Sequence, residues 1–121
     1  MKKPSRTTAG ASEAILGVIR SIPKGKIASY SAIAAAAGFP RHHRLVVRLL
    51  NLHGRSLPWQ RVVGAGGEIK LRMGSALDQR MRLEMEGVAF RGRRVASDHI
   101  LSSEDLVCTG LIFRAAISPP L

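Results

Sequence analysis

Apolar residues recur at helical spacing near the start of the chain. Ser12 is a suitable N-cap for a helix, and Pro23 and Gly25 would end it. One face of this predicted helix holds apolar residues at the i, i+3, i+4 and i+7 positions: Ile15, Val18, Ile19 and Ile22. Residues 1–11 offer almost nothing to bury and are predicted to be a disordered basic lead-in.

Two further short helices are predicted, separated by a tight turn. Ser29 caps the first, which begins at Tyr30 and stops at Gly38, a residue type typical of the position after a helix. The second runs from about Arg41 to Leu52, with Pro40 near its first turn. Its apolar stripe is formed by Leu45, Leu49 and Leu52, with Val46 beside them. Two short helices joined in this way form a helix-turn-helix.

The next part of the chain predicts a hairpin and one more helix. Val62 and Val63, a turn at residues 64–67 and the segment 68–71 are typical of a short β-hairpin or wing. Ser75 is predicted to cap the last helix. The apolar face of that helix is expected in the core and holds Leu77, Met81, Met85 and Val88.

These elements predict a mostly α, small winged helix-turn-helix-like domain over residues 12–90. At 121 residues the chain has the length of one domain with one modest core. From Arg91 a basic linker leads into a mixed acidic and apolar tail. The pattern leaves open whether residues 91–121 add a strand or hairpin or stay loosely ordered.

The charge of the chain favours a polyanionic partner. The net charge is +11, and residues 1–90 hold 15 basic and 5 acidic residues, or +10. Nucleic acid is the expected partner, because no segment has the length of a membrane span and there is no clear signal peptide. On the predicted third helix, Arg41, Arg44 and Arg48 share one side, where they could contact DNA. The alternative is a basic protein whose charge only aids solubility.

The sequence predicts no catalytic residue, metal or cofactor. Cys108 is the only cysteine, so the chain forms no internal disulfide and has no pair of thiolates for a metal, and a reducing, cytoplasmic setting is expected. The four histidines lack zinc-ligand spacing with that cysteine. No serine, cysteine or lysine is paired with an evident base in the pattern.

Trp59 is the only tryptophan of an aromatic-poor chain and follows Pro58. The residues around it leave two interpretations open. It could be the largest unit of the core, as buried tryptophans usually are, or a side chain presented at the wall of a pocket.

Several ordered motifs between about Ser12 and Phe90 carry a family resemblance. They are Ile22-Pro23-Lys24-Gly25-Lys26-Ile27-Ala28-Ser29-Tyr30, then Ile33-Ala34, Ala37-Gly38-Phe39-Pro40, Arg44, Asn51, Pro58-Trp59-Gln60-Arg61-Val62, Gly67 and Glu86-Gly87. The chain resembles the DNA-binding domain of O6-alkylguanine-DNA alkyltransferases. It is most similar to alkyltransferase-like proteins, in which the acceptor cysteine of a Pro-Cys-His-Arg motif is replaced, commonly by tryptophan.

The resemblance implies a base-flipping site. Tyr30 would press on the phosphate 3′ of the target nucleotide, and Arg44 would enter the base stack and fill the vacated space. The recognition helix would lie in the minor groove, with Ser29, Arg41 and Arg48 as further DNA contacts. Extrusion of a base costs a few kcal/mol, and less where O6-alkylation has weakened pairing.

The resemblance also implies a lesion pocket at Pro58-Trp59-Gln60-Arg61. Trp59 stands where the acceptor cysteine would be, and an indole cannot accept an alkyl group as a thiolate does. Gln60 replaces the histidine that relays a proton in the catalytic family. Arg61 would hold the loop through backbone carbonyls, and Arg72 would lie at the pocket rim over the guanine face.

The chain departs from the family pattern in two places. Residues 45–50 are bulkier than the glycine-containing helix usual in the family, and the 51–58 loop is about two residues shorter than in some relatives. Both changes bear on how deeply the helix enters the groove and how wide the pocket is.

The resulting hypothesis is a monomeric, non-enzymatic protein that binds duplex DNA containing O6-alkylguanine and marks it for nucleotide excision repair. The expected location is cytoplasmic, or nucleoid-associated if bacterial. Two alternatives stay open at this point. One is an enzyme with residual alkyl transfer or another lesion-processing activity through Cys108 or an unrecognised base. The other is a winged-helix transcription or architectural factor indifferent to alkylation.

Overall fold

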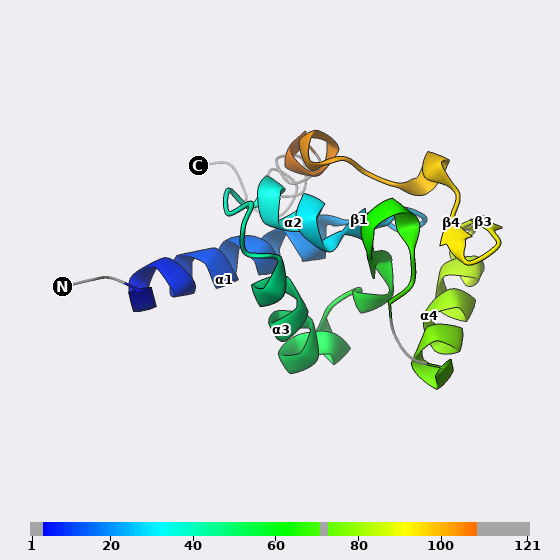
Figure 1. Cartoon of the computed structure of the whole chain (residues 1–121), viewed down its shortest axis with the longest axis horizontal. Coiled ribbons are helices and arrows are strands. Elements are labelled where there is room, and N and C mark those ends of the chain that lie inside the picture. The colour runs from blue at the N-terminus through cyan, green and yellow to red at the C-terminus, as the bar shows by residue number, and fades with distance from the viewer. Residues whose placement is uncertain (1–3, 71–72, 109–121) are drawn as a thin grey trace, which may run out of the picture.

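A computed structural model describes residues 4–70 and 73–108 of the chain (Figure 1). The α-helices in these ranges are α1 (Pro4–Ser21), α2 (Tyr30–Ala36), α3 (His43–His53) and α4 (Met73–Met85). The strands are two residues each: β1 (Ala28–Ser29), β2 (Val62–Val63), β3 (Phe90–Arg91) and β4 (Arg94–Val95). Short 3-10 turns occur at Gly54–Ser56, Trp59–Arg61, Ala65–Gly67 and Ser97–His99. The predicted mostly helical class is therefore confirmed.

The helix α1 begins at Pro4 rather than near Ser12, which corrects the expected disorder for residues 4–11. Proline is well suited to the first position of a helix because its φ is already helical and its missing N–H needs no partner there. Ala11 is fully buried, so α1 already packs on the rest of the domain before Ser12.

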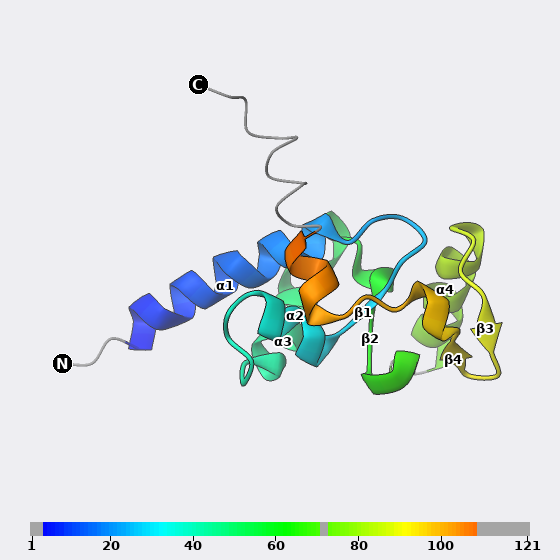
Figure 2. The ribbon, with the colours of Figure 1, turned by 90° about the horizontal axis from the view of Figure 1, so that it is seen from above.

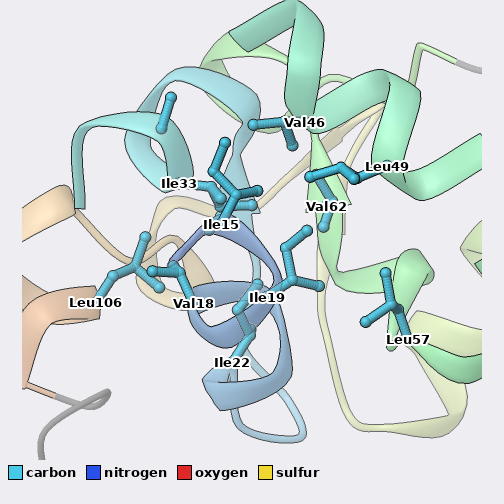
Figure 3. Close-up of a cluster of buried hydrophobic side chains, with 12 residues drawn as sticks. Ile15, Val18, Ile19, Ile22, Ile33, Val46, Leu49, Leu57, Val62 and Leu106 are labelled. Atoms are coloured by element: carbon cyan, nitrogen blue, oxygen red, sulfur yellow. The ribbon is translucent and has the colours of Figure 1, made fainter. Parts of the chain in front are cut away.

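The core around α1 follows the predicted pattern. The four apolar residues on its inner face are all buried, and they pack on α2 and α3 in one cluster (Figure 3): Ile15, Val18, Ile19 and Ile22. Ser29 caps α2 as predicted, because its Oγ accepts a hydrogen bond from the Ala32 amide (3.1 Å). Gly38 then adopts a φ of +92°, a left-handed conformation that favours glycine in the turn before α3.

The helix α3 begins at His43, so Arg41 lies in the turn before it. Val46 and Leu49 are buried as expected, whereas Leu52 is exposed. The predicted apolar stripe is thus wrong at its last member, because α3 runs past the core and its end lies in solvent.

The predicted hairpin over residues 62–71 is wrong, and a hairpin lies elsewhere. Val62 and Val63 are both buried and pair in parallel with Ala28 and Ser29. A strand that is buried on both faces has apolar residues in a row, without alternation. Two successive valines fit such a strand as well as one arm of a hairpin, so the sequence alone does not separate the two. The antiparallel pair is β3–β4, closed at Gly92, whose φ is +63°.

The helix α4 turns a different face to the core than predicted. It begins at Met73, so Ser75 lies inside it and is not its cap. The residues expected in the core are exposed: Leu77 by 64%, Met81 by 61% and Met85 by 83%. Gln79 and Leu83 are buried instead, while Val88, beyond the helix, is buried as predicted.

The start of the tail, up to residue 108, is ordered on the domain. Residues 103–108 are helical and lie beside α1 and α2 (Figure 2). Ser102 and Asp105 cap this segment reciprocally, each amide donating to the other's side chain (3.0 and 3.1 Å). Leu106 is fully buried in the α1–α3 cluster. Among the described residues, no helix combines the length and the apolar character needed to cross a membrane.

Leu106→Ala should lower the free energy of unfolding by about 2–4 kcal/mol, because it removes a fully buried side chain and leaves a cavity. Val107→Ala is the matched control: Val107 is 45% exposed, so its loss should cost at most about 0.5 kcal/mol. Urea unfolding of both variants measures the difference. Equal, small effects would show that residues 103–108 do not pack on the core.

Candidate lesion-binding site

Trp59 begins the 3-10 turn Trp59–Arg61 and is only partly buried. Its amide donates to the Leu57 carbonyl (2.8 Å), and the Arg61 amide donates to the Pro58 carbonyl (3.0 Å). Leu57 and Val62, on either side of the turn, both belong to the buried cluster around α1. The indole is therefore presented at the edge of the core rather than inside it.

A cavity of about 360 Å³ opens beside this indole. Tyr30, the first residue of α2, and Trp59 both line it. The remaining walls come from α3, the loop after it, β2 and α4: Val47, Leu50, Asn51, Gly54, Val62, Ser75 and Asp78. The bulky side chains noted in α3 thus form part of the cavity wall instead of filling the cavity. Its volume lies in the range of small-molecule sites.

Tyr30 is held at the cavity by the Ser29 cap that starts α2. The side chain is about half-buried, and this burial raises the pKa of the phenol above its ordinary value. Tyr30 therefore stays protonated at physiological pH and keeps an O–H group that can donate a hydrogen bond.

The arginines predicted to contact DNA lie next to the cavity. Arg44 and Arg48 are exposed on α3, and they share one helix face with the cavity residues Val47 and Asn51 at the i, i+3, i+4 and i+7 positions. Arg41 is exposed in the preceding turn. A partner that covers this face of α3 would meet the guanidinium groups and the mouth of the cavity together.

Glu86 anchors the Trp59 turn from behind. Its carboxylate accepts hydrogen bonds from Gln60 Nε2 (2.8 Å), from Arg61 Nε (3.0 Å) and Nη2 (3.1 Å), and from the Gly25 amide (3.1 Å). Arg61 Nη1 also donates to the Ile22 carbonyl (2.8 Å). One carboxylate therefore joins the end of α4, the Trp59 turn and the turn after α1.

Burial alone would raise the pKa of Glu86. The hydrogen bonds from Arg61, Gly25 and Gln60, together with the positive charge of Arg61, outweigh that effect and hold the pKa below its ordinary value. The Glu86–Arg61 pair is thus a charged, nearly buried ion pair in which two nitrogens of the guanidinium donate to the carboxylate.

Gln79 supports the same turn from α4. Its Nε2 donates to the carbonyls of Gln60 (3.0 Å) and Val62 (2.9 Å), which explains why a polar side chain occupies the buried face of this helix. Hydrophobic periodicity could not identify this residue, because the feature that buries it is a pair of backbone acceptors.

Arg82 contacts the indole and was missed by the sequence analysis. Its guanidinium carbon lies 5.5 Å from the centre of the Trp59 ring, and its Nε is 2.9 Å from Asp78 Oδ1. The i, i+4 spacing of Asp78 and Arg82 was a visible signal for an ion pair, but not for its place over the tryptophan. Arg72, which the resemblance placed at the pocket rim, lies outside the described residues.

Cys108 is exposed and does not line the cavity. Within residues 4–70 and 73–108, no three histidine, cysteine, aspartate or glutamate side chains gather closely enough to hold a metal ion.

A family model agrees with this arrangement of helices and cavity. The model described as "6-O-methylguanine DNA methyltransferase, DNA binding domain" matches residues 11–88. The chain belongs to this family. The 6-O-methylguanine DNA methyltransferase match covers α1 from Ala11 onward, all of α2 to α4 and every described residue of the cavity.

Three named proteins are similar to this chain over about 77 residues. A DNA base-flipping protein of Vibrio parahaemolyticus is 47% identical over 77 residues, which cover 61% of this chain and 76% of that protein. A DNA base-flipping protein of Escherichia coli is 38% identical over 77 residues, covering 62% of this chain and 60% of that protein. Alkyltransferase-like protein 1 of Schizosaccharomyces pombe is 38% identical over 78 residues, covering 61% of this chain and 72% of that protein.

The solved structures include S. pombe Atl1 in complex with damaged DNA containing O6-carboxymethylguanine. That chain is 25% identical, with a TM-score of 0.64 and coverage of 84% of this chain and 99% of its own. The resemblance to the alkyltransferase-like proteins and the predicted fold are therefore confirmed.

Glu86→Gln should lower the free energy of unfolding by about 2 kcal/mol at pH 7, because the nearly buried Arg61 guanidinium loses its counter-ion. The folded-state pKa of Glu86 is depressed, so this stabilisation is complete above the ordinary glutamate pKa of about 4.3 and is lost as pH falls through the lower folded-state value. The gap between wild type and variant should thus narrow below about pH 4.

Denaturant unfolding between pH 7 and pH 3 measures this gap. Glu84→Gln is the matched control, since Glu84 pairs with Arg80 on the exposed surface and its loss should cost at most about 0.5 kcal/mol. A Glu86→Gln effect as small as that of Glu84→Gln at pH 7 would contradict the anchoring role of Glu86.

Proposed function

We propose that this chain is a non-enzymatic sensor of O6-alkylguanine in duplex DNA. It binds the minor groove through α3 and holds the lesion, flipped out of the helix, in the cavity between Tyr30 and Trp59. The observation that carries the proposal is this one cavity, which Tyr30 and Trp59 both line and which lies beside the arginine face of α3.

The cavity has the features that a flipped base requires. Trp59 gives a flat apolar wall on which a base can stack, and Arg82 covers part of the same ring. Tyr30 presents its protonated phenol at the cavity, where it can press on the adjacent backbone phosphate. Asn51 and Asp78 supply polar edges that can hydrogen-bond to the base.

The arginines of α3 complete the flipping step. Arg44 enters the base stack and fills the space that the base leaves, while Arg48 and Arg41 hold the phosphate backbone with Ser29 beside Tyr30. Flipping costs a few kcal/mol, and O6-alkylation lowers this cost by weakening the base pair. The lesion is therefore selected both by its ease of extrusion and by the pocket that receives it.

None of the described residues that line the cavity is a cysteine, the residue that accepts the alkyl group in the catalytic family. Trp59 occupies the acceptor position of the family motif, Gln60 donates to Glu86 in place of a proton relay, and Cys108 lies away from the cavity lining. The product of the encounter is a stable complex with the damaged DNA. This complex marks the lesion for nucleotide excision repair.

The first test is the affinity of the purified chain for a duplex with one O6-methylguanine and for the same duplex with guanine, at one fixed salt concentration. We expect tighter binding to the lesion and no methyl label on the protein after prolonged incubation. Equal affinity for the two duplexes would refute the sensor, and label transferred to the protein would refute its non-enzymatic nature.

Tyr30→Ala and Arg44→Ala should each reduce the preference for the lesion at least about tenfold, because each removes a group that offsets the cost of flipping. Arg93→Ala is the control: it makes the same charge change in the exposed β3–β4 turn, so it should weaken binding to both duplexes equally and leave the preference intact. A lesion preference unchanged by Arg44→Ala would contradict the finger role of Arg44.

A further inference from the structure

A second hollow lies beside Tyr30 and measures about 250 Å³. Its walls come from the start of α2, the start of α3 and the loop after β2. The described residues that line it are Tyr30, Ser31, His43, Gly64, Ala65 and Lys70. None of these residues is acidic, and four of them carry a side-chain group that can donate a hydrogen bond. This set of groups favours an anionic ligand.

The pairing of β1 with β2 explains how these walls come together (Figure 2). The two strands run in parallel with Ser29 beside Val63, so the residues that follow, Tyr30 and Gly64, leave the same end of the pair. His43 is the first residue of α3, which packs on α2 in the core. Three segments that are distant in the sequence therefore meet at the hollow.

Lys70 is placed at the hollow by its own loop. The Gly64 amide donates to the Glu68 carbonyl (2.7 Å), and the Lys70 ammonium is 3.3 Å from Glu68 Oε1. The stem of Lys70 crosses Gly64, since a Cβ on Gly64 would lie 2.7 Å from Lys70 Cε. The φ of Gly64 is −80°, which any residue can adopt. The glycine thus gives space to the lysine rather than an unusual turn to the chain.

Tyr30 lines both the second hollow and the cavity beside Trp59. On α3, His43 lines the hollow, and Val47, about one turn further on, lines the cavity. The two spaces are therefore neighbours, next to the arginine face of α3. A DNA strand whose base enters the cavity brings its backbone past Tyr30 to the hollow.

We propose that the second hollow binds one phosphate of the damaged strand, the phosphate on the 3′ side of the flipped nucleotide, through Lys70 and His43. The proposal rests on the proposed function, in which Tyr30 presses on the adjacent backbone phosphate while the base occupies the cavity. The hollow receives the phosphate that Tyr30 displaces. Its volume is below the roughly 300–1,000 Å³ of sites for drug-sized ligands, which suits so compact a group.

The side chains at the hollow match the needs of a phosphodiester. The Lys70 ammonium supplies a positive charge, and the His43 imidazole supplies an N–H donor. Ser31 adds a hydroxyl group at the start of α2, where its Oγ lies 3.3 Å from Ser29 Oγ. A phosphate held by these groups keeps the backbone in its rotated position and so stabilises the flipped state.

Glu68 leaves Lys70 free to bind a phosphate. Their ion pair is exposed, and exposed pairs contribute little because solvent and salt screen them. An ammonium group has three N–H donors, so Lys70 can keep its contact with Glu68 and still donate to a phosphate oxygen. Glu68 itself is not among the described residues that line the hollow.

The test pairs one charge of the protein with one charge of the DNA. Each duplex of a series contains O6-methylguanine and one uncharged methylphosphonate, placed at a different phosphate around the lesion. Lys70→Gln should weaken binding to the fully charged lesion duplex at least about threefold, because a charged hydrogen bond is lost. It should have no further effect on the duplex whose 3′ phosphate is neutral, since that contact is already absent.

His43→Ala should show the same pattern with a smaller loss, because an imidazole supplies a donor but not the full charge of the lysine. Lys26→Gln is the matched control. It removes the same charge from a lysine that does not line the hollow and whose Nζ lies 3.4 Å from the Asp98 carbonyl. Its effect should be equal on every duplex of the series.

The outcomes separate the phosphate site from the function beneath it. A Lys70→Gln effect of one size on every duplex, or one that disappears only at another phosphate, would overturn the site. The sensor would then still stand on the preference of the wild type for O6-methylguanine over guanine. Equal wild-type affinity for those two duplexes would instead overturn the sensor, and the phosphate site with it.

Discussion

The site depends on one carboxylate. Glu86 lies just after α4, yet it fixes the Trp59 turn through Gln60 and Arg61 and the turn after α1 through the Gly25 amide. The other bonds of this segment come from its own short 3-10 turn, from Gln79, from the bond of Arg61 to the Ile22 carbonyl and from the pairing of β2 with β1, and none of them joins the end of α4 to the turn after α1. Because a binding site must keep its groups within a fraction of an ångström, this buried charge matters for the cavity as well as for the fold.

The same turn connects the helix-turn-helix to α4. The parallel pairing of β1 with β2 brings Val62 beside Ala28, and so brings Trp59 toward Tyr30 at the start of α2. The helices α1 to α3 form a core that is independent of α4, and α4 then closes the cavity with Ser75 and Asp78. The cavity is therefore an interface between two parts of the domain, where pockets are commonly found.

Much of the first half of the fold could be predicted from the sequence. The apolar spacing of α1, the Ser29 cap and the glycine at the end of α2 are local signals, and local physics decides them. The family motifs also led to Tyr30 and Trp59, which line one cavity. These residues could be identified because each is part of a short motif with a fixed order.

The remaining features depend on contacts between segments that are distant in the sequence. The spacing of apolar residues within one segment carries no information about such contacts. The buried face of α4 was mistaken because Gln79 is buried by two backbone carbonyls and the methionines are exposed beside a hollow. The hairpin was misplaced because two buried valines give no alternation. Arg82 was missed because its position over Trp59 follows from how α4 packs on the turn.

The most direct measurement of the proposed recognition is the fluorescence of Trp59, the only tryptophan of the chain. A duplex with O6-methylguanine should quench this emission, since a flipped base stacked at the cavity wall contacts the indole, and an unmodified duplex bound to the same extent should not. Saturating binding of lesion DNA with unchanged Trp59 emission would contradict the placement of the lesion beside Trp59.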